Sequence, residues 1–321
     1  MKPLIVLTGP TAVGKTALSI ELAKEVGGEI VSADSMQVYR GMDIGSAKIR
    51  PQETQGIPHH LIDVLDPSQD FNVVVFQQLC RRAMEGIYER GNIPILTGGT
   101  GFYIQAVLQD IDFTENPEDN GYRRQLERLA AEKGGQALHE MLEAVDPGAA
   151  QAIHAHNIKR MIRALEFYQL TGEKISEHNE REAEKTSPYR FCYFVLNDDR
   201  ERLYRRIEER VDRMLEEGLV EEVRALMDRG CRRDMVSMQG LGYKEILDHL
   251  AGECTLEEAV YRIKQGTRHF AKRQLTWFRR ERDVIWLNKP DYGYDEEKIL
   301  AVMVRHLREA GILPSAAQAA R

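Results

Sequence analysis

Short apolar runs alternate with amphipathic stretches of helical length through the first hundred residues. The runs of strand length cover residues 4–8, 29–32, 60–64 and 93–97. One amphipathic stretch covers residues 15–26, and a longer one begins at a cap, Asn72, and ends at Arg90 before Gly91. This alternation predicts a parallel sheet that is built from βαβ units and flanked by helices.

The pattern changes after residue 112. Residues 113–187 contain no convincing strand, and helical periodicity covers 122–133, 136–145 and 158–170, the last between Asn157 and Gly172. Strand character returns at 190–196 and again at 284–287, with helical patterns at 200–217, 220–229 and 256–282. We therefore expect an α/β catalytic core at 1–112 and 188–290, an all-helical insertion domain at 113–187, and a C-terminal helix with a frayed tail at 291–321.

Composition narrows the class of protein. The chain has 321 residues, 42% of them hydrophobic and 30% charged, which is ordinary for a globular protein and excludes collagen-like and disordered classes. No apolar run approaches the roughly 18 residues of a spanning helix, so we expect no membrane contact. The 4 cysteines are widely spaced, which indicates neither a disulfide framework nor a zinc site. A reduced, cytoplasmic, monomeric protein is the default expectation.

Charge is unevenly distributed along the chain. The totals of 44 Lys plus Arg against 51 Asp plus Glu give a formal net charge of −7. Residues 262–282 nevertheless contain a single acid, Glu281, among many arginines, lysines and aromatic residues, and Lys159, Arg160 and Arg163 form a smaller basic group. Such segments are compatible with a nucleic-acid surface, although a solvated amphipathic helix has the same composition.

A phosphate-binding motif follows the first expected strand and opens the first expected helix. Its residues, which fit G-x-x-x-x-G-K-[ST] in full, are Gly9, Pro10, Thr11, Ala12, Val13, Gly14, Lys15 and Thr16. Backbone N–H groups, the helix N-terminus and Lys15 favour a diphosphate or triphosphate, and the Thr16 hydroxyl can bind Mg²⁺. We therefore expect a P-loop NTPase-like core.

The acid that nucleotide hydrolases of this class carry on a later strand is missing. Residues 93–96 lead into Thr97-Gly98-Gly99-Thr100-Gly101, which has no carboxylate, whereas Asp34 follows the second strand. The carboxyl ends of neighbouring parallel strands share one edge of a sheet, so Asp34 is expected to face the phosphate loop. There it can hold Mg²⁺ through water or act as a general base on an acceptor.

Four ordered motifs carry a resemblance to a known family. They are the phosphate loop, Asp34-Ser-Met-Gln-Val-Tyr-Arg-Gly-Met-Asp-Ile-Gly45, Pro58-His-His-Leu-Ile-Asp63 and Gly98-Gly-Thr-Gly-Phe-Tyr103. In these motifs, and in further ones out to about residue 287, the chain resembles the bacterial tRNA dimethylallyltransferases (tRNA isopentenyltransferases). Phe102 in place of the more usual Leu and Ser46 in place of Thr are small departures.

The resemblance implies a reaction and its catalytic residues. The phosphate loop is expected to hold dimethylallyl diphosphate, and the acceptor is the exocyclic amine of the adenine immediately 3′ of a tRNA anticodon. The implied catalytic residues are Asp34 as base, Lys15 and Mg²⁺ on Thr16 at the leaving group, Thr100 at the adenine, and an arginine. Arg210 is our choice of arginine, and Arg206 and Arg213 are close alternatives.

The resemblance also implies a tRNA surface. The adenine has to leave its stack to reach the diphosphate, and the helical insertion is expected to clamp the anticodon stem-loop. The expected tRNA contacts are Asp34, Ser35, Met36, Gln37, Thr100, Arg123, Lys159, Arg160, Arg163, Gln239, Gly240, Lys244, Arg273 and Gln274.

Two other functions fit part of the sequence. A P-loop small-molecule kinase that uses ATP explains the phosphate loop and Asp34, but not the insertion or the basic aromatic helix. A nucleotide-switched RNA-binding protein explains the basic segments but needs no catalytic base. Loss of modification with retained tRNA binding after a change at Asp34 separates the transferase from such a switch.

Overall fold

The chain forms two compact units in a computed structural model that describes residues 1–113 and 121–314. The first unit combines Met1–Leu108 with Pro188–Arg321, and the second is the segment Gln109–Ser187 between them. The helical segment thus begins at Gln109, close to the boundary at residue 113 that the sequence pattern predicts. The expected frayed tail at 315–321 lies outside the described residues.

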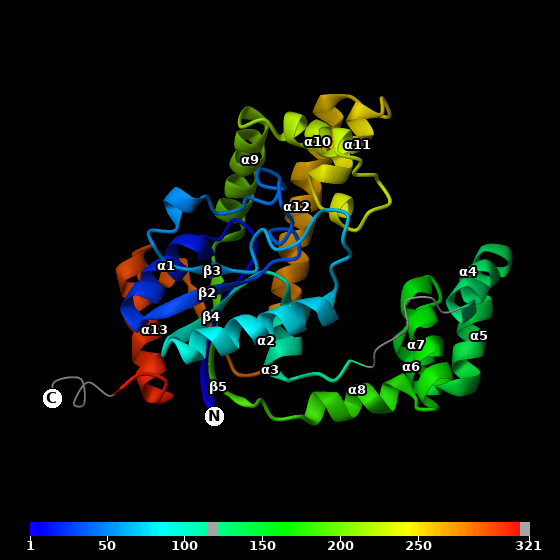
Figure 1. The fold of residues 1–321 in the computed structure, drawn as a ribbon, viewed down its shortest axis with the longest axis horizontal. Helices are drawn as coiled ribbons and strands as arrows, with labels where there is room; N and C mark the ends of the chain where they lie inside the picture. The colour runs from blue at the N-terminus through cyan, green and yellow to red at the C-terminus, as the bar shows by residue number, and fades with distance from the viewer. Residues whose placement is uncertain (114–120, 315–321) are drawn as a thin grey trace. The chain divides into compact units, whose positions relative to one another are not determined.

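A six-stranded, all-parallel sheet forms the centre of the first unit (Figure 1). The strand order is β3-β2-β4-β1-β5-β6, which places β1 between β4 and β5. The strands are β1 (Lys2–Thr8), β2 (Gly28–Ala33), β3 (His59–His60), β4 (Ile93–Gly98), β5 (Tyr189–Asn197) and β6 (Val284–Asn288). This architecture confirms the predicted α/β class, with a P-loop NTPase-like core and helices beside a parallel sheet.

Helices of the first unit pack against this sheet and against one another. They are α1 (Lys15–Val26), α2 (Val73–Glu89), α3 (Gly101–Leu108), α9 (Arg200–Glu216), α10 (Leu219–Asp228), α11 (Tyr243–Leu250), α12 (Leu256–Phe278) and α13 (Glu296–Glu309). Helix α1 lies beside α13, while α9 and α11 pack on α12 (Figure 1). Alternate β1 residues Ile5 and Leu7 are fully buried in the core that includes Leu22 of α1 and Met303 of α13, as expected for a strand covered on both faces.

The second unit is helical throughout its described residues. Its helices are α4 (Gly121–Lys133), α5 (Gly135–Val145), α6 (Pro147–Ala152), α7 (Ile158–Thr171) and α8 (Ile175–Glu184). Leu126, Leu138, Leu142 and Met161 form the centre of a separate small core. The apolar spacing on three of these helices buries one face of each, which is why the segment has a core of its own.

Three expectations about secondary structure need correction. The expected strand at 60–64 is only His59–His60, because Leu61 (φ 62°) and Asp63 (φ 56°) adopt left-handed backbone conformations that end a strand. Helix α12 ends at Phe278 rather than at residue 282. Helices α3, α6, α8 and α11 were not expected at all, since each is short and lies in a stretch of mixed pattern.

The parallel strands bring their carboxyl ends to one edge of the sheet. The segments that leave this edge carry Gly9 after β1, Asp34 after β2, Thr100 after β4 and Lys289 after β6. The carboxyl edge is the ordinary place for a ligand site in such a sheet.

None of the helices within residues 1–113 and 121–314 has the length and apolar character that crossing a membrane requires.

Candidate active site

The backbone of the phosphate loop requires glycine at two positions. Gly9 has φ 147°, and a Cβ there would lie 2.2 Å from the carbonyl oxygen of Leu196 in β5. Ala12 (φ 65°) and Gly14 (φ 103°) are left-handed, so the chain turns sharply before α1. Gly14 is the N-cap of α1 and provides no side-chain cap, so the first N–H groups of the helix stay available to an anion.

Lys15 folds back over this loop. Its Nζ donates to the carbonyl oxygens of Gly9 (2.9 Å) and Pro10 (2.8 Å). The pKa of Lys15 is lowered to about 7, mainly by burial and also by the positive charge of Arg210, while the negative charge of Asp34 opposes the shift. Thr16 follows at the first turn of α1 and is exposed, as a hydroxyl that binds a metal ion beside a phosphate should be.

Asp34 and Thr100 lie at the ends of neighbouring strands. Ala33 pairs with Gly98, and the backbone N–H of Thr100 donates to the carbonyl oxygen of Ala33 at 3.3 Å. Asp34 Oδ1 accepts from the N–H groups of Met36 (2.8 Å) and Gln37 (3.3 Å), which fixes the orientation of the carboxylate. Its Oδ2 has no hydrogen-bond donor among the residues that the structure describes, so it is available to a substrate or to Mg²⁺.

Three arginines of α9 approach the same edge. Arg206, Arg210 and Arg213 lie one helical turn apart, and their side chains have no hydrogen bond or ion pair within residues 1–113 and 121–314. Burial lowers the pKa of Arg210, the like charges of Arg206 and Arg213 lower it further, and Asp34 raises it. Unpaired guanidinium groups that repel one another are poised for an anion with several charges.

The three arginines differ in what they face. The negative charge of Asp34 raises the pKa of both Lys15 and Arg210, so the three side chains belong to one electrostatic site. An Arg206 nitrogen instead lies 3.5 Å from where a Cβ of Gly14 would be. Arg210 also lines a cavity of about 360 Å³ together with Arg213, Lys48 and Asp63.

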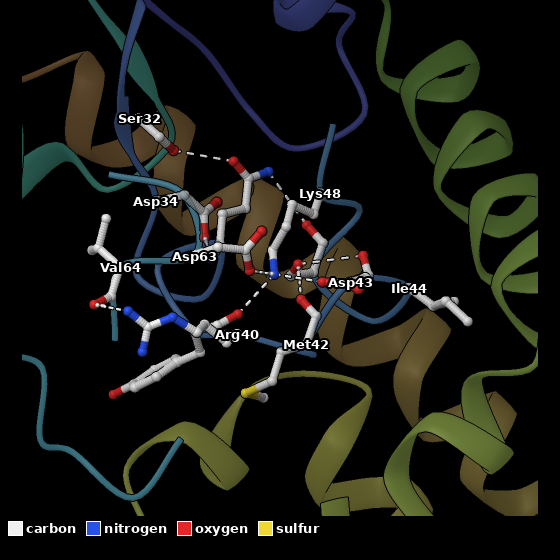
Figure 2. Close-up of polar contacts among 12 residues, drawn as sticks. Ser32, Asp34, Arg40, Met42, Asp43, Ile44, Lys48, Asp63 and Val64 are labelled. Atoms are coloured by element: carbon white, nitrogen blue, oxygen red, sulfur yellow. Dashed lines mark hydrogen bonds and ion pairs between the residues drawn. The ribbon is translucent and has the colours of Figure 1, made fainter. Parts of the chain in front are cut away.

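The loop after Asp34 is fixed from inside by a buried lysine. Lys48 Nζ donates to the carbonyl oxygen of Tyr39 (2.7 Å) and to the carboxylates of Asp43 (2.5 Å) and Asp63 (2.6 Å), and Figure 2 shows the amine directed between the two acids. The Ser32 hydroxyl, also drawn there, donates to Gln37 Oε1 at 3.0 Å. Because a buried ammonium needs partners, this network holds the loop in one conformation.

The same loop is fixed from outside by Glu222 of α10. Its carboxylate accepts from the N–H groups of Asp43 (2.9 Å), Ile44 (2.8 Å) and Gly45 (3.1 Å), and from the Tyr243 hydroxyl at 2.8 Å. A Cβ at Gly45 would lie 2.6 Å from the buried Tyr243 ring, so only glycine permits this approach. No local motif marks Glu222 for this role.

Several residues expected to contact tRNA lie near this loop. Met36 packs against Gly240, where a Cβ would lie 2.5 Å from the Met36 methyl carbon. Lys244 is partly exposed beside Glu245 (3.7 Å), and the Gln239 amide donates to the Arg233 carbonyl oxygen. The structure thus brings the segments 34–37 and 239–244 together, and Ser35 is half-buried.

The two residues of α12 that are expected to contact tRNA lie in different environments. Arg273 is exposed and lies 5.7 Å from the Phe270 ring centre, so it can contact RNA. Gln274 is buried, with 6% of its surface exposed, and both ends of its amide bond to protein backbone. Lys264 and Arg268, from the basic segment, are paired with Asp212 and Glu208 of α9 rather than left free.

The four basic residues of the helical unit that are expected to contact tRNA lie on two of its helices. Lys159, Arg160 and Arg163 are exposed on α7. Arg123 of α4 makes a two-pronged ion pair with the buried Glu166 of α7, at 3.0 and 2.6 Å. This pair joins the two helices, so Arg123 has a structural partner besides any RNA contact, which stays a prediction.

Lys289, after β6, also lies at the phosphate loop. Its nearly buried amine is 3.5 Å from the Val13 carbonyl oxygen, 3.2 Å from Glu296, and 3.3 Å from where a Cβ of Gly14 would be. No motif marks this lysine, and only the pairing of β6 with β5 brings it here.

Comparison with known proteins agrees with this geometry. A model of the IPP transferase family matches residues 37–281, and a model of isopentenyl transferases matches residues 2–69. The chain is 60% identical over 313 residues to a tRNA dimethylallyltransferase of Lachnoclostridium phytofermentans (98% of this chain, 100% of the relative). It is 52% identical over 294 residues to the Geobacillus kaustophilus protein of that name (92% and 93%).

Solved structures give the same result. The full-length tRNA isopentenylpyrophosphate transferase of Bacillus halodurans superimposes with a TM-score of 0.73 at 46% identity, covering 97% of this chain and 98% of that one. A eukaryotic dimethylallyltransferase acting on tRNA gives a TM-score of 0.78 at 32% identity, covering 90% of this chain and 74% of that one. From its phosphate loop to its last strand, therefore, this chain belongs to the tRNA dimethylallyltransferase family.

Proposed function

We propose that this enzyme transfers the dimethylallyl group of dimethylallyl diphosphate to the exocyclic amine of the adenine immediately 3′ of the anticodon in tRNA. The bond from that nitrogen to the allylic carbon forms, the carbon–oxygen bond to the diphosphate breaks, and the proton of the amine leaves. The observation that carries the proposal is the position of Asp34, which is next to Thr100 and within electrostatic reach of Lys15.

The phosphate loop and its cations hold the leaving group. Negative charge develops on the diphosphate as the carbon–oxygen bond breaks, and fixed N–H groups and cations stabilise it without reorganising. The uncapped N–H groups at the start of α1, together with Lys15 and Arg210, supply these groups. Arg210 is the arginine that we assign, because its charge lowers the pKa of Lys15 and the charge of Asp34 raises the pKa of Arg210 itself.

A magnesium ion fits the residues at this edge. The exposed Thr16 hydroxyl and the free oxygen of Asp34 are hard oxygen ligands, and Mg²⁺ commonly takes few protein ligands beside a diphosphate and water. When bound, the ion neutralises charge on the diphosphate. Thr16 would hold it directly and Asp34 through water, which leaves the free oxygen of Asp34 able to take a proton.

Asp34 is the base that we assign to the amine. An exocyclic adenine amine is a poor nucleophile because its lone pair is delocalised into the ring, so removing its proton as the new bond forms lowers the barrier. The Thr100 hydroxyl is the hydrogen-bond partner that we assign to the adenine. The two hydrogen bonds from Met36 and Gln37 to the other carboxylate oxygen orient Asp34 for this task.

A base in a stacked loop cannot reach this site, so the adenine has to be extruded. We assign the tRNA contacts near the site to Ser35, Met36, Gln37, Gln239, Gly240 and Lys244, and further phosphate contacts to Arg273 and to Arg123, Lys159, Arg160 and Arg163. The enzyme is proposed to act as a monomer in the cytoplasm. The kinase alternative loses its support, because the relatives and solved structures are named for transfer to tRNA.

The test is incubation with labelled dimethylallyl diphosphate and unmodified tRNA, followed by nucleoside analysis. Label is expected on the adenine 3′ of the anticodon, and no label on a matched tRNA that has guanine at this position. Label transfer from ATP to a small molecule, with none to tRNA, would contradict the proposal.

A further inference from the structure

Gln274 joins two loops that are far apart in the sequence. Its Oε1 accepts from the backbone N–H of Thr11 at 2.9 Å, and its Nε2 donates to the carbonyl oxygen of Gly99 at 2.9 Å. Thr11 belongs to the phosphate loop, and Gly99 precedes Thr100. One buried side chain therefore spans the segment that we assign to the diphosphate and the segment that we assign to the adenine.

The backbone around Gly99 is shaped to receive α12. A Cβ at Gly99 would lie 2.1 Å from Gln274 Nε2, and a Cβ at Gly101 would lie 2.2 Å from Cδ1 of Trp277, one helical turn further on. Both glycines let the helix touch the loop backbone directly. The pairing of β1 with β4 holds the starts of the two loops together, and Gln274 sets how Thr11 and Gly99 lie beyond that pairing.

We propose that Gln274 is a positioning residue for the transfer reaction, which sets the separation of the phosphate loop from Thr100 and does not read RNA. The proposal deepens the proposed function and rests on it. Two features of the structure carry it: Gln274 is only 6% exposed, and its amide oxygen and nitrogen are both engaged by backbone groups. The amide keeps one further N–H and one further acceptor site, but with 6% of the residue exposed these have little access to a nucleotide unless one of the two loops is released.

The geometry also explains why glutamine serves here. A backbone N–H on one side and a backbone carbonyl on the other require one acceptor and one donor on the same side chain, and an amide provides both. Methionine fills a similar volume but provides no N–H donor and only a weak acceptor. Asparagine carries the same amide on a shorter stem and does not span both loops.

The experiment compares Gln274→Met with Arg273→Ala, its exposed neighbour on α12. The affinities for inorganic pyrophosphate with Mg²⁺ and for tRNA are measured separately by titration, alongside KM for dimethylallyl diphosphate and kcat. Gln274→Met is expected to raise KM for dimethylallyl diphosphate and the pyrophosphate Kd about tenfold, as loss of a buried hydrogen bond does, and to leave the tRNA Kd within about twofold. Arg273→Ala is expected to show the opposite pattern, a weaker tRNA Kd with unchanged pyrophosphate binding.

A second variant disturbs the contact between Gln274 and Gly99 from the side of the loop. Gly99→Ala displaces the Gln274 amide without replacing any residue of α12, so it should raise the pyrophosphate Kd in the same way. Weaker tRNA binding with unchanged pyrophosphate binding in Gln274→Met would show that Gln274 reads RNA. Unchanged affinities, or equal loss of both affinities in the two variants, would equally overturn the positioning role. A wild-type protein that binds no pyrophosphate and transfers no label would instead refute the proposed function.

Discussion

The carbonyl oxygen of Ala33 accepts a hydrogen bond from the backbone N–H of Thr100, at 3.3 Å. This bond continues the pairing of β2 with β4 by one residue beyond the Ala33–Gly98 pair. It sets Asp34, the first residue after β2, beside Thr100, the second residue after β4. The base and the adenine contact that we assign are thus connected through main chain rather than through flexible side chains.

Replacing Asp34 with asparagine should remove the base and keep the fold. Asparagine retains an oxygen that can accept from the N–H groups of Met36 and Gln37, so the local turn is preserved. We expect kcat to fall about 10²- to 10⁴-fold, the usual contribution of a positioned base. Single-turnover transfer and a tRNA-binding titration measure the two effects. A variant that loses tRNA affinity in proportion to its rate would contradict a role in proton removal.

Binding of pyrophosphate should be linked to protonation of Lys15. With a pKa lowered to about 7 by burial, this lysine is largely neutral at pH 8 in the free enzyme. A diphosphate beside it favours the ammonium form and raises its pKa, so binding at pH 8 should take up about one proton and affinity should fall as the pH rises above 7. Calorimetry in buffers of different ionisation enthalpy measures the uptake.

Lys15→Arg is the matched control for this linkage. Arginine keeps the positive charge but stays protonated, so protonation of the ligand itself is the same in both titrations and cancels. The arginine variant should take up about one proton fewer than the wild type at pH 8. Equal uptake in the two proteins would show that Lys15 is already charged in the free enzyme.

Removing the Glu222 carboxylate should destabilise the protein. Glu222→Ala leaves three backbone N–H groups and the buried Tyr243 hydroxyl without their acceptor. We expect a loss of about 2–4 kcal/mol in the free energy of unfolding, because each buried unsatisfied group is costly. Urea denaturation measures the loss. Glu221→Ala, at the exposed neighbouring position, is the control. Among the described residues the only ion pair of Glu221 is a 3.9 Å contact with Arg224, so the free energy of unfolding should change little.

Acid stability should depend on Glu29. This carboxylate is 2% exposed and accepts from Arg90, Asn92 and His60, and the Arg90 hydrogen bond lowers its pKa to about 2. A lowered pKa stabilises the fold at pH values above the ordinary 4.5, and this contribution is lost as the pH falls from 4.5 toward 2.

Glu29→Gln tests this dependence. It should lower the unfolding free energy at pH 7 by about 2 kcal/mol and flatten the profile between pH 4.5 and pH 2. Glu25→Gln, at an exposed position of α1, is the control. Parallel profiles for the Glu29 variant and the wild type would contradict the assignment.

The sequence was sufficient where local pattern decides the structure. Helix α1 covers Lys15–Val26 as its periodicity predicts, and Asn72 caps α2 by accepting from the N–H groups of Val74 and Val75. The place of Asp34 followed from the rule that parallel strands share a carboxyl edge. Local pattern failed at 60–64, where two left-handed residues end an apolar run that looks like a strand.

Residues that act through distant contacts could not be predicted in the same way. The family resemblance implies that Gln274 contacts RNA, and only packing shows that it turns inward to Thr11 and Gly99. Lys289 and Glu222 carry no motif, and their roles depend on which strands and helices become neighbours. A side chain whose partner lies far along the sequence leaves no local signal.

The central position of β1 has a consequence for how the enzyme is made. One neighbour of β1, the strand β4, follows closely in the chain, but the other, β5, is translated only after the entire helical segment Gln109–Ser187. Leu196, whose carbonyl oxygen lies against Gly9, therefore leaves the ribosome late. Gln274, which accepts a hydrogen bond from Thr11, leaves later still. A nascent chain that has completed its first hundred residues possesses the whole phosphate-binding motif and β4, but lacks β5 and α12, which also shape the loop. Newly synthesised enzyme should thus acquire affinity for its small substrate only when nearly all of its polypeptide has emerged.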